Sequence, residues 1–358
     1  MPSLKEIKGR INSISSTLAI TSAMKMVASA KLQKAQMAIQ NMLPYERRLY
    51  SMLLDLMGAM NISAAASEDG SVRGSGSAER GFDQSGDRLS LSNRHDLAGM
   101  DGAYSLMAQR EVRKVAIVAF ASNSSLCGAF NSNAIREATA VINEYRASGL
   151  RDSDIVVYSV GRKMAEAMRK LGFPSPADFT KMSDSPSYEA ASALAQELLD
   201  GFVSGRFDKV ELVYNHYKST SSQPTTRQTY LPLSLADATA DLQAGKIADS
   251  ASESDTNRGA EPVGAPVVRQ GSPTTEDLIV EPSKEELIAT LLPKVIRLRI
   301  FTTLLDSAAA EHAARTVAMQ LATDNCNDLL QELTLEYNKG RQQKITSEIL
   351  DLVGGSMQ

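Results

Sequence analysis

The chain has few of the residues on which compact enzymes and metal proteins depend. Tryptophan is absent, 5% of residues are aromatic, and the two cysteines, Cys127 and Cys326, show no CxxC spacing. Neither a disulfide framework nor a zinc ribbon is therefore supported, and a reducing compartment is expected. Three histidines, His95, His216 and His312, lie in three separate segments. That scatter predicts neither a metal site nor a histidine-based triad.

Long apolar runs are also missing. None reaches the roughly 18 residues that a membrane span requires, so no span is expected. The N-terminus begins directly with a patterned segment, and no signal or transit peptide is expected there.

Net charge is small, with 38 Lys and Arg against 42 Asp and Glu, which disfavours general nucleic-acid binding. The first helix is the exception. Its basic residues far outnumber Glu6 and Glu46; they are Lys5, Lys8, Arg10, Lys25, Lys31, Lys34, Arg47 and Arg48. This excess indicates an acidic partner surface or nucleic acid, and the lack of aromatic residues before Tyr45 lowers the second alternative.

Both ends of the chain have a coiled-coil pattern. Residues 3–58 are predicted to be helical, with Ser3 and Glu6 as a capping box and with Pro44 kinking the helix or breaking it in two. The apolar seam of its first turns alternates spacings of four and three: Ile7, Ile11, Ile14 and Leu18.

The segment 283–353 carries the same alternation for about seven heptads, which predicts a helix on the order of 100 Å long that must project from any domain of this size. Its seam comprises Leu291, Val295, Leu298, Thr302, Leu305, Ala309, His312, Thr316, Met319, Thr323, Cys326, Leu330, Leu333, Tyr337 and Gly340. Small and polar residues in mid-seam weaken the helix pair and indicate that other proteins surround it.

Between the two ends, strands alternate with helices, which predicts a small parallel α/β sheet. The expected strands are 112–121, 154–160 and 209–218, with 227–233 as a possible fourth; the expected helices are 131–148, 162–171 and 187–204. Two further segments, 61–108 and 236–280, are rich in Gly, Ser and charged residues, and they are predicted to be flexible or loosely ordered.

One element resembles a phosphate-binding loop. SNSSLCGAFNSN at 122–133 follows a strand and precedes a helix, but its glycine spacing fits neither the dinucleotide fingerprint nor the P-loop. A structural turn around Gly128, with Cys127 as a small buried apolar residue, is favoured. An α/β nucleotide-binding enzyme and a coiled-coil scaffold or nucleic-acid-binding rod remain as alternatives.

Three stretches together resemble the gamma subunit of F-type ATP synthases. They are ITSAMKMVASAKLQKAQ at 20–36, SLCGAFN at 125–131, and most of 308–355, which ends in Ile345-Thr346 followed by Glu348, Asp351 and Gly354-Gly355. The resemblance covers about three quarters of the chain. Ser356 stands where alanine is common in the family.

This resemblance implies that the terminal helices form an antiparallel coiled coil beside a Rossmann-like α/β domain with a small parallel sheet. The expected organisation is an N-terminal coiled-coil helix, a flexible insertion, an α/β domain, an acidic linker and a C-terminal coiled-coil helix, at 1–60, 61–110, 111–235, 236–282 and 283–358. The insertions lack the cysteine pair of chloroplast relatives. One or both are hypothesised to act as a mobile regulatory element that limits rotation in one direction.

The function implied is that of a central-stalk rotor shaft without catalytic, cofactor or metal-binding residues. It couples ion-driven rotation of the membrane ring to conformational cycling of the catalytic head. The expected partners are the alpha and beta subunits, the epsilon subunit and the c-ring, but not nucleic acid. The expected location is peripheral, on the cytoplasmic face of the bacterial inner membrane.

Site residues follow from the same resemblance, and all are predicted contacts with other subunits. Those facing the acidic lever loop of the beta subunit are Met24, Lys25, Val27 and Arg315. Those meeting its catch loop are Arg341, Gln342 and Thr346. Those fitting the apolar sleeve of the head are Leu352 and Val353.

Overall fold

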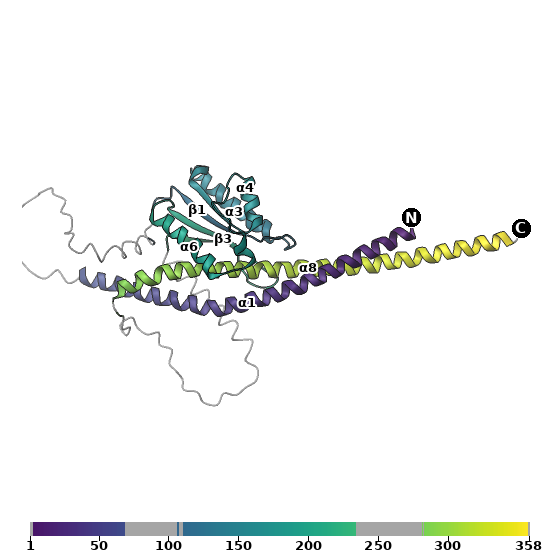
Figure 1. Cartoon of the computed structure of the whole chain (residues 1–358), viewed down its shortest axis with the longest axis horizontal. Helices are drawn as coiled ribbons and strands as arrows, with labels where there is room; N and C mark the ends of the chain where they lie inside the picture. Colours follow the sequence, from purple (N-terminus) through teal and green to yellow (C-terminus); the bar gives the residue numbers. More distant parts are fainter. Residues whose placement is uncertain (1–2, 69–105, 107–109, 234–280, 282, 357–358) are drawn as a thin grey trace, which may run out of the picture.

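Two long helices form a rod, and a small α/β domain lies against its side (Figure 1). This computed structural model describes residues 3–68, 106, 110–233, 281 and 283–356. Helix α1 spans Leu4–Glu68, and helix α8 spans Lys284–Ser356. They run antiparallel, so the start of α1 and the end of α8 lie toward the same end of the rod (Figure 1).

The predicted seams are confirmed on both helices. Ile7 is buried, while Ile11, Ile14 and Leu18 are half-buried among exposed neighbours. In the stretch 321–340 of α8, most residues are exposed, and the seam residues are half-buried: Thr323, Cys326, Leu330, Leu333, Tyr337 and Gly340. The antiparallel register follows from contacts far apart in sequence: Leu4 with Gly340, Thr21 with Thr323, Leu32 with Ala309, and Tyr50 with Arg299.

Helix α1 begins as predicted, since the Glu6 N–H donates to Ser3 Oγ at 3.2 Å. Of the two effects expected of Pro44, a kink or a break, the break is not found, because α1 continues to Glu68. Pro44 and Gln40 are both exposed, so water can hydrate the carbonyl of Gln40 that loses its helical partner. The predicted boundary near residue 60 therefore falls inside α1. Most of the predicted insertions at 61–110 and 236–282 lies outside the described residues.

The α/β domain contains a four-stranded sheet in the order β2-β1-β3-β4. Its strands are β1 Val115–Phe120, β2 Ile155–Val160, β3 Lys209–Asn215 and β4 Thr225–Leu231. The parallel sheet is confirmed for the first three strands, whereas β4 pairs antiparallel with β3. The connection at 216–224 is too short for the crossover that a parallel neighbour requires, so the chain returns as a hairpin.

Helices cover both faces of this sheet. They are α3 Phe130–Ala147, α4 Arg162–Lys170, α5 Thr180–Asp184 and α6 Tyr188–Val203, with a 3₁₀ turn η2 at Asp152–Asp154. All the helices predicted here are found with slightly different ends, and α5 was not predicted. Alternate residues of β1 enter two cores: Ile117 packs toward α3 and α4, and Val118 packs toward α6 and α8. The base of α8 is therefore a core helix of the α/β domain as well as half of the rod.

Gly161, between β2 and α4, offers a stability test. Its φ is +99°, and an added Cβ would overlap the backbone of Ala121. Gly172 has a similar φ of +91° but open space around it. Gly161→Ala is expected to lower the free energy of unfolding by about 1–3 kcal/mol more than Gly172→Ala. Urea unfolding followed by circular dichroism measures this, and equal losses would contradict the tight packing at Gly161.

Candidate partner-binding surface

The last residues of α8 project beyond the start of α1 at Leu4 (Figure 1). Leu4 reaches Gly340, where an added Cβ would lie 3.2 Å from Leu4 Cδ2, and the described side chains from 341 onward are exposed. The seam itself becomes polar here, because its next positions are Lys344 and Ser347. The stretch 341–356, here called the tip, is a single helix (Figure 1).

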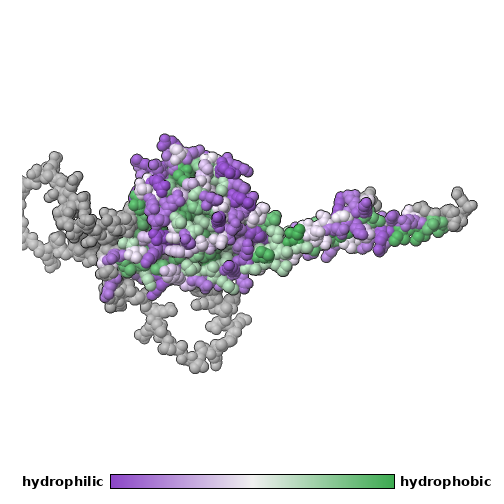
Figure 2. All heavy atoms as spheres, in the orientation of Figure 1, coloured by the Kyte–Doolittle hydropathy of each residue, from purple (hydrophilic) through white to green (hydrophobic). Residues whose placement is uncertain are grey.

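Large apolar side chains are exposed on the tip. They are Ile345, Ile349, Leu350, Leu352 and Val353, with exposed fractions of 47–74%. Ile345, Ile349 and Leu352 follow helical spacing and so share a face. Figure 2 shows hydrophobic surface at this end of the rod and again where the rod leaves the α/β domain. Exposed apolar surface of this kind marks interaction sites in proteins.

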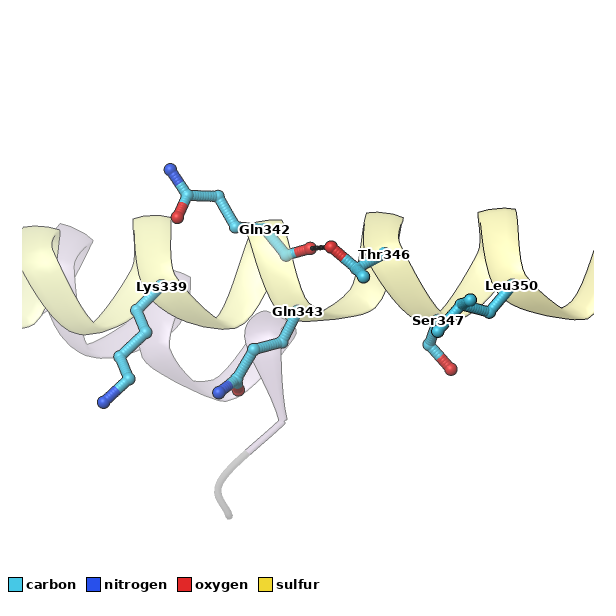
Figure 3. A pocket seen from close by; sticks show the side chains of 6 residues that line it. All are labelled: Lys339, Gln342, Gln343, Thr346, Ser347 and Leu350. Carbon is cyan, nitrogen blue, oxygen red and sulfur yellow. Dashed lines mark hydrogen bonds between the residues drawn. The ribbon is translucent and has the colours of Figure 1, made fainter.

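A shallow hollow lies on α8 beside the first residues of α1. It is lined by Lys339, Gln342, Gln343, Thr346, Ser347 and Leu350. In Figure 3, Lys339 and Gln343 point to one side of α8, and Gln342 points to the other. The Thr346 hydroxyl donates to the carbonyl of Gln342 at 2.9 Å, so it is held along the helix. The other polar side chains extend outward from the helix, where they can accept or donate hydrogen bonds.

The middle of the rod exposes apolar residues of α1 beside half-buried ones. Met26 and Val27 are 66% and 58% exposed, while Met24 and Lys25 are half-buried. On α8, the other helix of the rod, Leu321 is also exposed. The predicted contact residues Met24, Lys25 and Val27 therefore lie on an accessible stretch of the two-helix rod.

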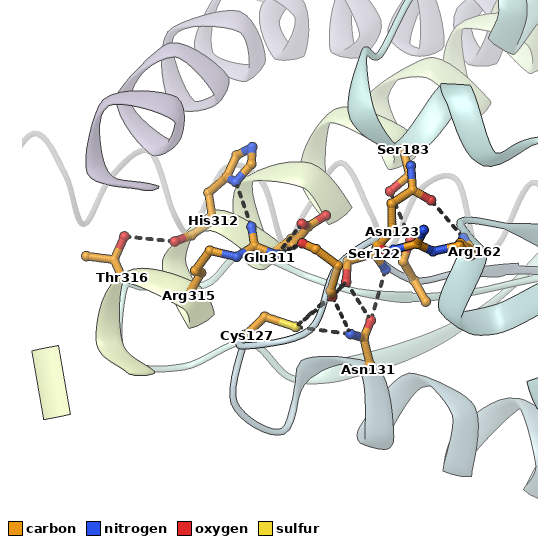
Figure 4. A network of polar contacts seen from close by, with 12 residues as sticks. Ser122, Asn123, Cys127, Asn131, Arg162, Ser183, Glu311, His312, Arg315 and Thr316 are labelled. Atoms are coloured by element: carbon orange, nitrogen blue, oxygen red, sulfur yellow. Dashed lines mark hydrogen bonds and ion pairs between the residues drawn. The ribbon is translucent and has the colours of Figure 1, made fainter. Parts of the chain in front are cut away.

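Arg315 occupies a different environment, inside a polar network that joins α8 to the turn after β1 (Figure 4). Its Nη2 donates to Ser124 Oγ and to Glu311 Oε1, each at 2.7 Å. Its side chain is only 11% exposed. Burial raises the pKa of Glu311, and the charge of Arg315 opposes that rise. The guanidinium therefore links the α/β domain to the rod within this chain.

His312 belongs to the same network. Its Nδ1 lies 3.4 Å from Arg315 Nη1, and its carbonyl accepts from the Thr316 hydroxyl at 2.8 Å. Burial, together with the charges of Arg315 and Lys31, lowers the pKa of His312 to about 4. The imidazole is therefore neutral at physiological pH and accepts from the arginine. His312, a residue of the predicted seam, is therefore hydrogen-bonded within the chain.

The turn at 122–133 is held by its own polar side chains. Asn131 Oδ1 accepts from the backbone N–H of Ser122 at 2.9 Å, and Asn131 Nδ2 donates to Cys127 Sγ at 3.1 Å. Cys127 is buried, and Gly128 has a φ of +58°. These contacts confirm the structural turn.

A second link between the domain and the rod had no local signal in the sequence. Asp306 of α8 accepts from His216 Nδ1 at 2.7 Å and from the Tyr217 N–H at 2.9 Å. His216 and Tyr217 directly follow β3, ninety residues before Asp306. A polar residue at the end of a buried strand was the available hint, but its partner could not be assigned from one sequence.

Within the part of the chain that the structure describes, no group of three or more potential metal ligands comes together. Over the same residues, no helix is long and apolar enough to cross a membrane.

The comparisons with known proteins cover the whole chain. A sequence model of the ATP synthase family matches residues 3–357. The ATP synthase gamma chain of Phocaeicola vulgatus is 47% identical over 357 residues, with all of both chains covered. That of Bacteroides thetaiotaomicron is 45% identical, again with full coverage of both.

The chain belongs to the ATP synthase gamma-chain family.

Gamma chains are non-catalytic subunits of ATP synthase, so the expectation that this chain is not itself an enzyme is confirmed. The fold agrees with a solved structure of an ATP synthase rotor. The rotor of the Euglena gracilis mitochondrial ATP synthase matches with a TM-score of 0.50 at 18% identity, and 96% of this chain and 98% of that chain are covered. The architecture of a rod with an attached α/β domain is thus shared at low sequence identity.

The link through His216 predicts a pH dependence of stability. The hydrogen bond to Asp306 raises the pKa of His216 against the opposing effects of burial and Lys218. A raised pKa means that the added stability is complete below about pH 6.5 and is lost as pH rises through the folded-state value. Because the side chain is half exposed, the effect is expected to be below about 1 kcal/mol.

Thermal unfolding at pH 6 and pH 8 measures this effect. The stability difference between wild type and His216→Gln should be larger at pH 6. All other ionisable groups are common to the two proteins, so the comparison cancels their contribution. A difference that is independent of pH would contradict a charged His216–Asp306 pair.

Proposed function

We propose that the chain is the central-stalk rotor shaft of an F-type ATP synthase, which couples ion-driven rotation to conformational cycling of the catalytic alpha and beta subunits. The observation that carries this proposal is the projecting rod with its exposed apolar side chains. In an isolated chain, the apolar side chains of a single projecting helix remain in contact with water. A shaft that is enclosed by other subunits buries them.

The shaft is asymmetric along its length. Two helices form its middle, one helix forms its tip, and the α/β domain lies to one side (Figure 1). A surrounding ring of equivalent subunits therefore meets a different face of the rod at each position. Since a ligand shifts a conformational equilibrium only by binding one state more tightly, each orientation of the shaft favours one nucleotide-binding state. ATP synthesis and hydrolysis occur on those other subunits.

The contacts proposed within the head follow the accessible parts of the rod. The mid-rod residues Met24, Lys25 and Val27 face the acidic lever loop of a beta subunit, and Lys25 supplies charge complementarity. Arg341, Gln342 and Thr346 lie at the base of the tip and meet the catch loop. Arg315 remains in the predicted contact set, although most of its side chain is engaged within the chain.

The end of the tip is proposed to fit an apolar sleeve of the head through Leu352 and Val353, whose side chains are 74% and 50% exposed. The α/β domain lies against the side of the rod, away from the tip (Figure 1), and the epsilon subunit and the c-ring are its proposed partners. The proposed location is peripheral, on the cytoplasmic face of the bacterial inner membrane.

Co-expression with the alpha and beta chains of the same genome tests the assembly. Purification through a tag on beta should recover one copy of this chain for each alpha/beta hexamer, as measured by native mass spectrometry. Free hexamer together with unbound chain would sink the proposal.

Two substitutions on the tip test its apolar face. Ile349→Asp places a charge among the apolar side chains, and Ser347→Asp places the same charge nearly opposite on the helix. Burying an isoleucine contributes about 1.5–3 kcal/mol, so Ile349→Asp should weaken binding to the hexamer roughly tenfold or more. Ser347→Asp should change it much less. Equal affinities in a binding titration would exclude this face as the contact.

A further inference from the structure

The loop at 216–224 extends from the sheet to both helices of the rod. It connects β3 to β4, and its own backbone holds its shape: the His216 N–H donates to the Pro224 carbonyl at 2.9 Å, and Ser219 and Ser222 exchange N–H···O bonds at 3.1 and 3.2 Å. Gln223 Nε2 also donates to the carbonyls of Ser219 and Thr220. These internal hydrogen bonds restrict the loop's conformation, so it is stiff enough to transmit force between the sheet and the rod.

Tyr217, near the start of this loop, packs against apolar residues from all three parts of the molecule. One group belongs to the rod seam: Leu32, Ala35 and Ile39 from α1, with Ala309 and Ala313 from α8. The other group joins the turn after β1 to α8: Cys127 and Phe130, with Ala310 and Ala314. The ring is thus common to the two clusters.

The polar atoms of Tyr217 also bond to both rod helices. Gln36 Nε2 of α1 donates to the Tyr217 hydroxyl at 2.6 Å. The backbone N–H of Tyr217 donates to Asp306 Oδ1 of α8 at 2.9 Å. One residue of the α/β domain therefore holds α1 by its side chain and α8 by its main chain.

Small side chains make this arrangement possible. Ala309, Ala310 and Ala313 of α8 are fully buried, and their size leaves room for an aromatic ring beside the helix. Ala309 lies on the seam, and Ala309 and Ala313 pack with Leu32 of α1. The ring adds apolar contact to this packing.

We propose that Tyr217 is a positioning residue that fixes the angle of the α/β domain relative to the paired helices and so sets the torsional stiffness of the shaft. Torque applied to the domain passes to α1 through the hydroxyl and to α8 through Asp306. Without these contacts, α1 is still held to the domain by the apolar packing of Tyr50, Leu53 and Leu56 in its core, but the junction at Tyr217 becomes less stiff. This inference rests on the proposed rotor function.

Two variants cut the link from opposite sides while keeping the packing. Tyr217→Phe removes the hydroxyl and keeps the ring, and Gln36→Leu removes the donor on α1. The matched control is Tyr158→Phe, which removes a hydroxyl bonded to Glu197 at 3.0 Å inside the α/β domain. All three substitutions keep the apolar volume close to that of the original side chain, so folding should be retained.

The first readout is amide hydrogen exchange of the segment 212–224 in the full chain. Loss of one hydrogen bond should raise the exchange rate about fivefold in Tyr217→Phe and in Gln36→Leu. The double variant should add little, because both changes remove the same bond. Tyr158→Phe should leave this segment unchanged. Unchanged exchange in both junction variants would overturn the proposal.

The second readout is mechanical and separates positioning from a purely structural role. In the reassembled complex, the angular variance of a probe on the α/β domain during pauses should rise in both junction variants, with the ATP hydrolysis rate unchanged. Equal variance in wild type and variants would overturn the proposal even if exchange had changed. Failure of the wild-type chain to bind a hexamer counts against the rotor function instead, and the exchange result still decides whether Tyr217 holds the junction.

Discussion

The double packing of α8 is the constraint on which the rest of the structure depends. Between Ile288 and Ala313, this helix forms one wall of the sheet's core and also packs along α1. Neither the α/β domain nor the rod could be completed without it. A single continuous helix shared by two cores leaves few ways for the domain to move independently, which is the property required of a part that transmits rotation.

The same helix becomes progressively less covered toward its C-terminal end. Most of its side chains are buried or half-buried between residues 291 and 320. From 321 to 340 the seam residues are half-buried, and from 341 every described side chain is exposed. The seam has small and polar residues in its middle, becomes apolar again at Leu330, Leu333 and Tyr337, and is polar from Lys344. The exposed tip is therefore the part of α8 with the most surface available to another protein.

Periodic features of the fold could be predicted from the sequence, because a coiled-coil seam repeats many times within one segment. The register of α8 from Leu291 to Gly340 needed no knowledge of its partner. Features set by tertiary contact were less accessible. Pro44 does not break α1, since it lies on the exposed face, and that orientation depends on where α8 packs. The antiparallel direction of β4 followed from the shortness of the 216–224 loop.

The candidate site shows the same division. Exposed residues of the tip were identified from their family resemblance and lie on accessible surface. Arg315 matched the same motif, but its bond to Ser124 spans 191 residues. The role of Tyr217 could not be predicted, since no sequence pattern links a tyrosine after a strand to a glutamine on α1.

The most direct test of the account is to observe rotation. With the alpha/beta hexamer fixed to a surface and a bead attached to the α/β domain of this chain, addition of ATP should drive stepwise rotation in one direction. A bead that only fluctuates about a fixed angle, in a complex that hydrolyses ATP, would contradict the claim that this chain is the rotating shaft.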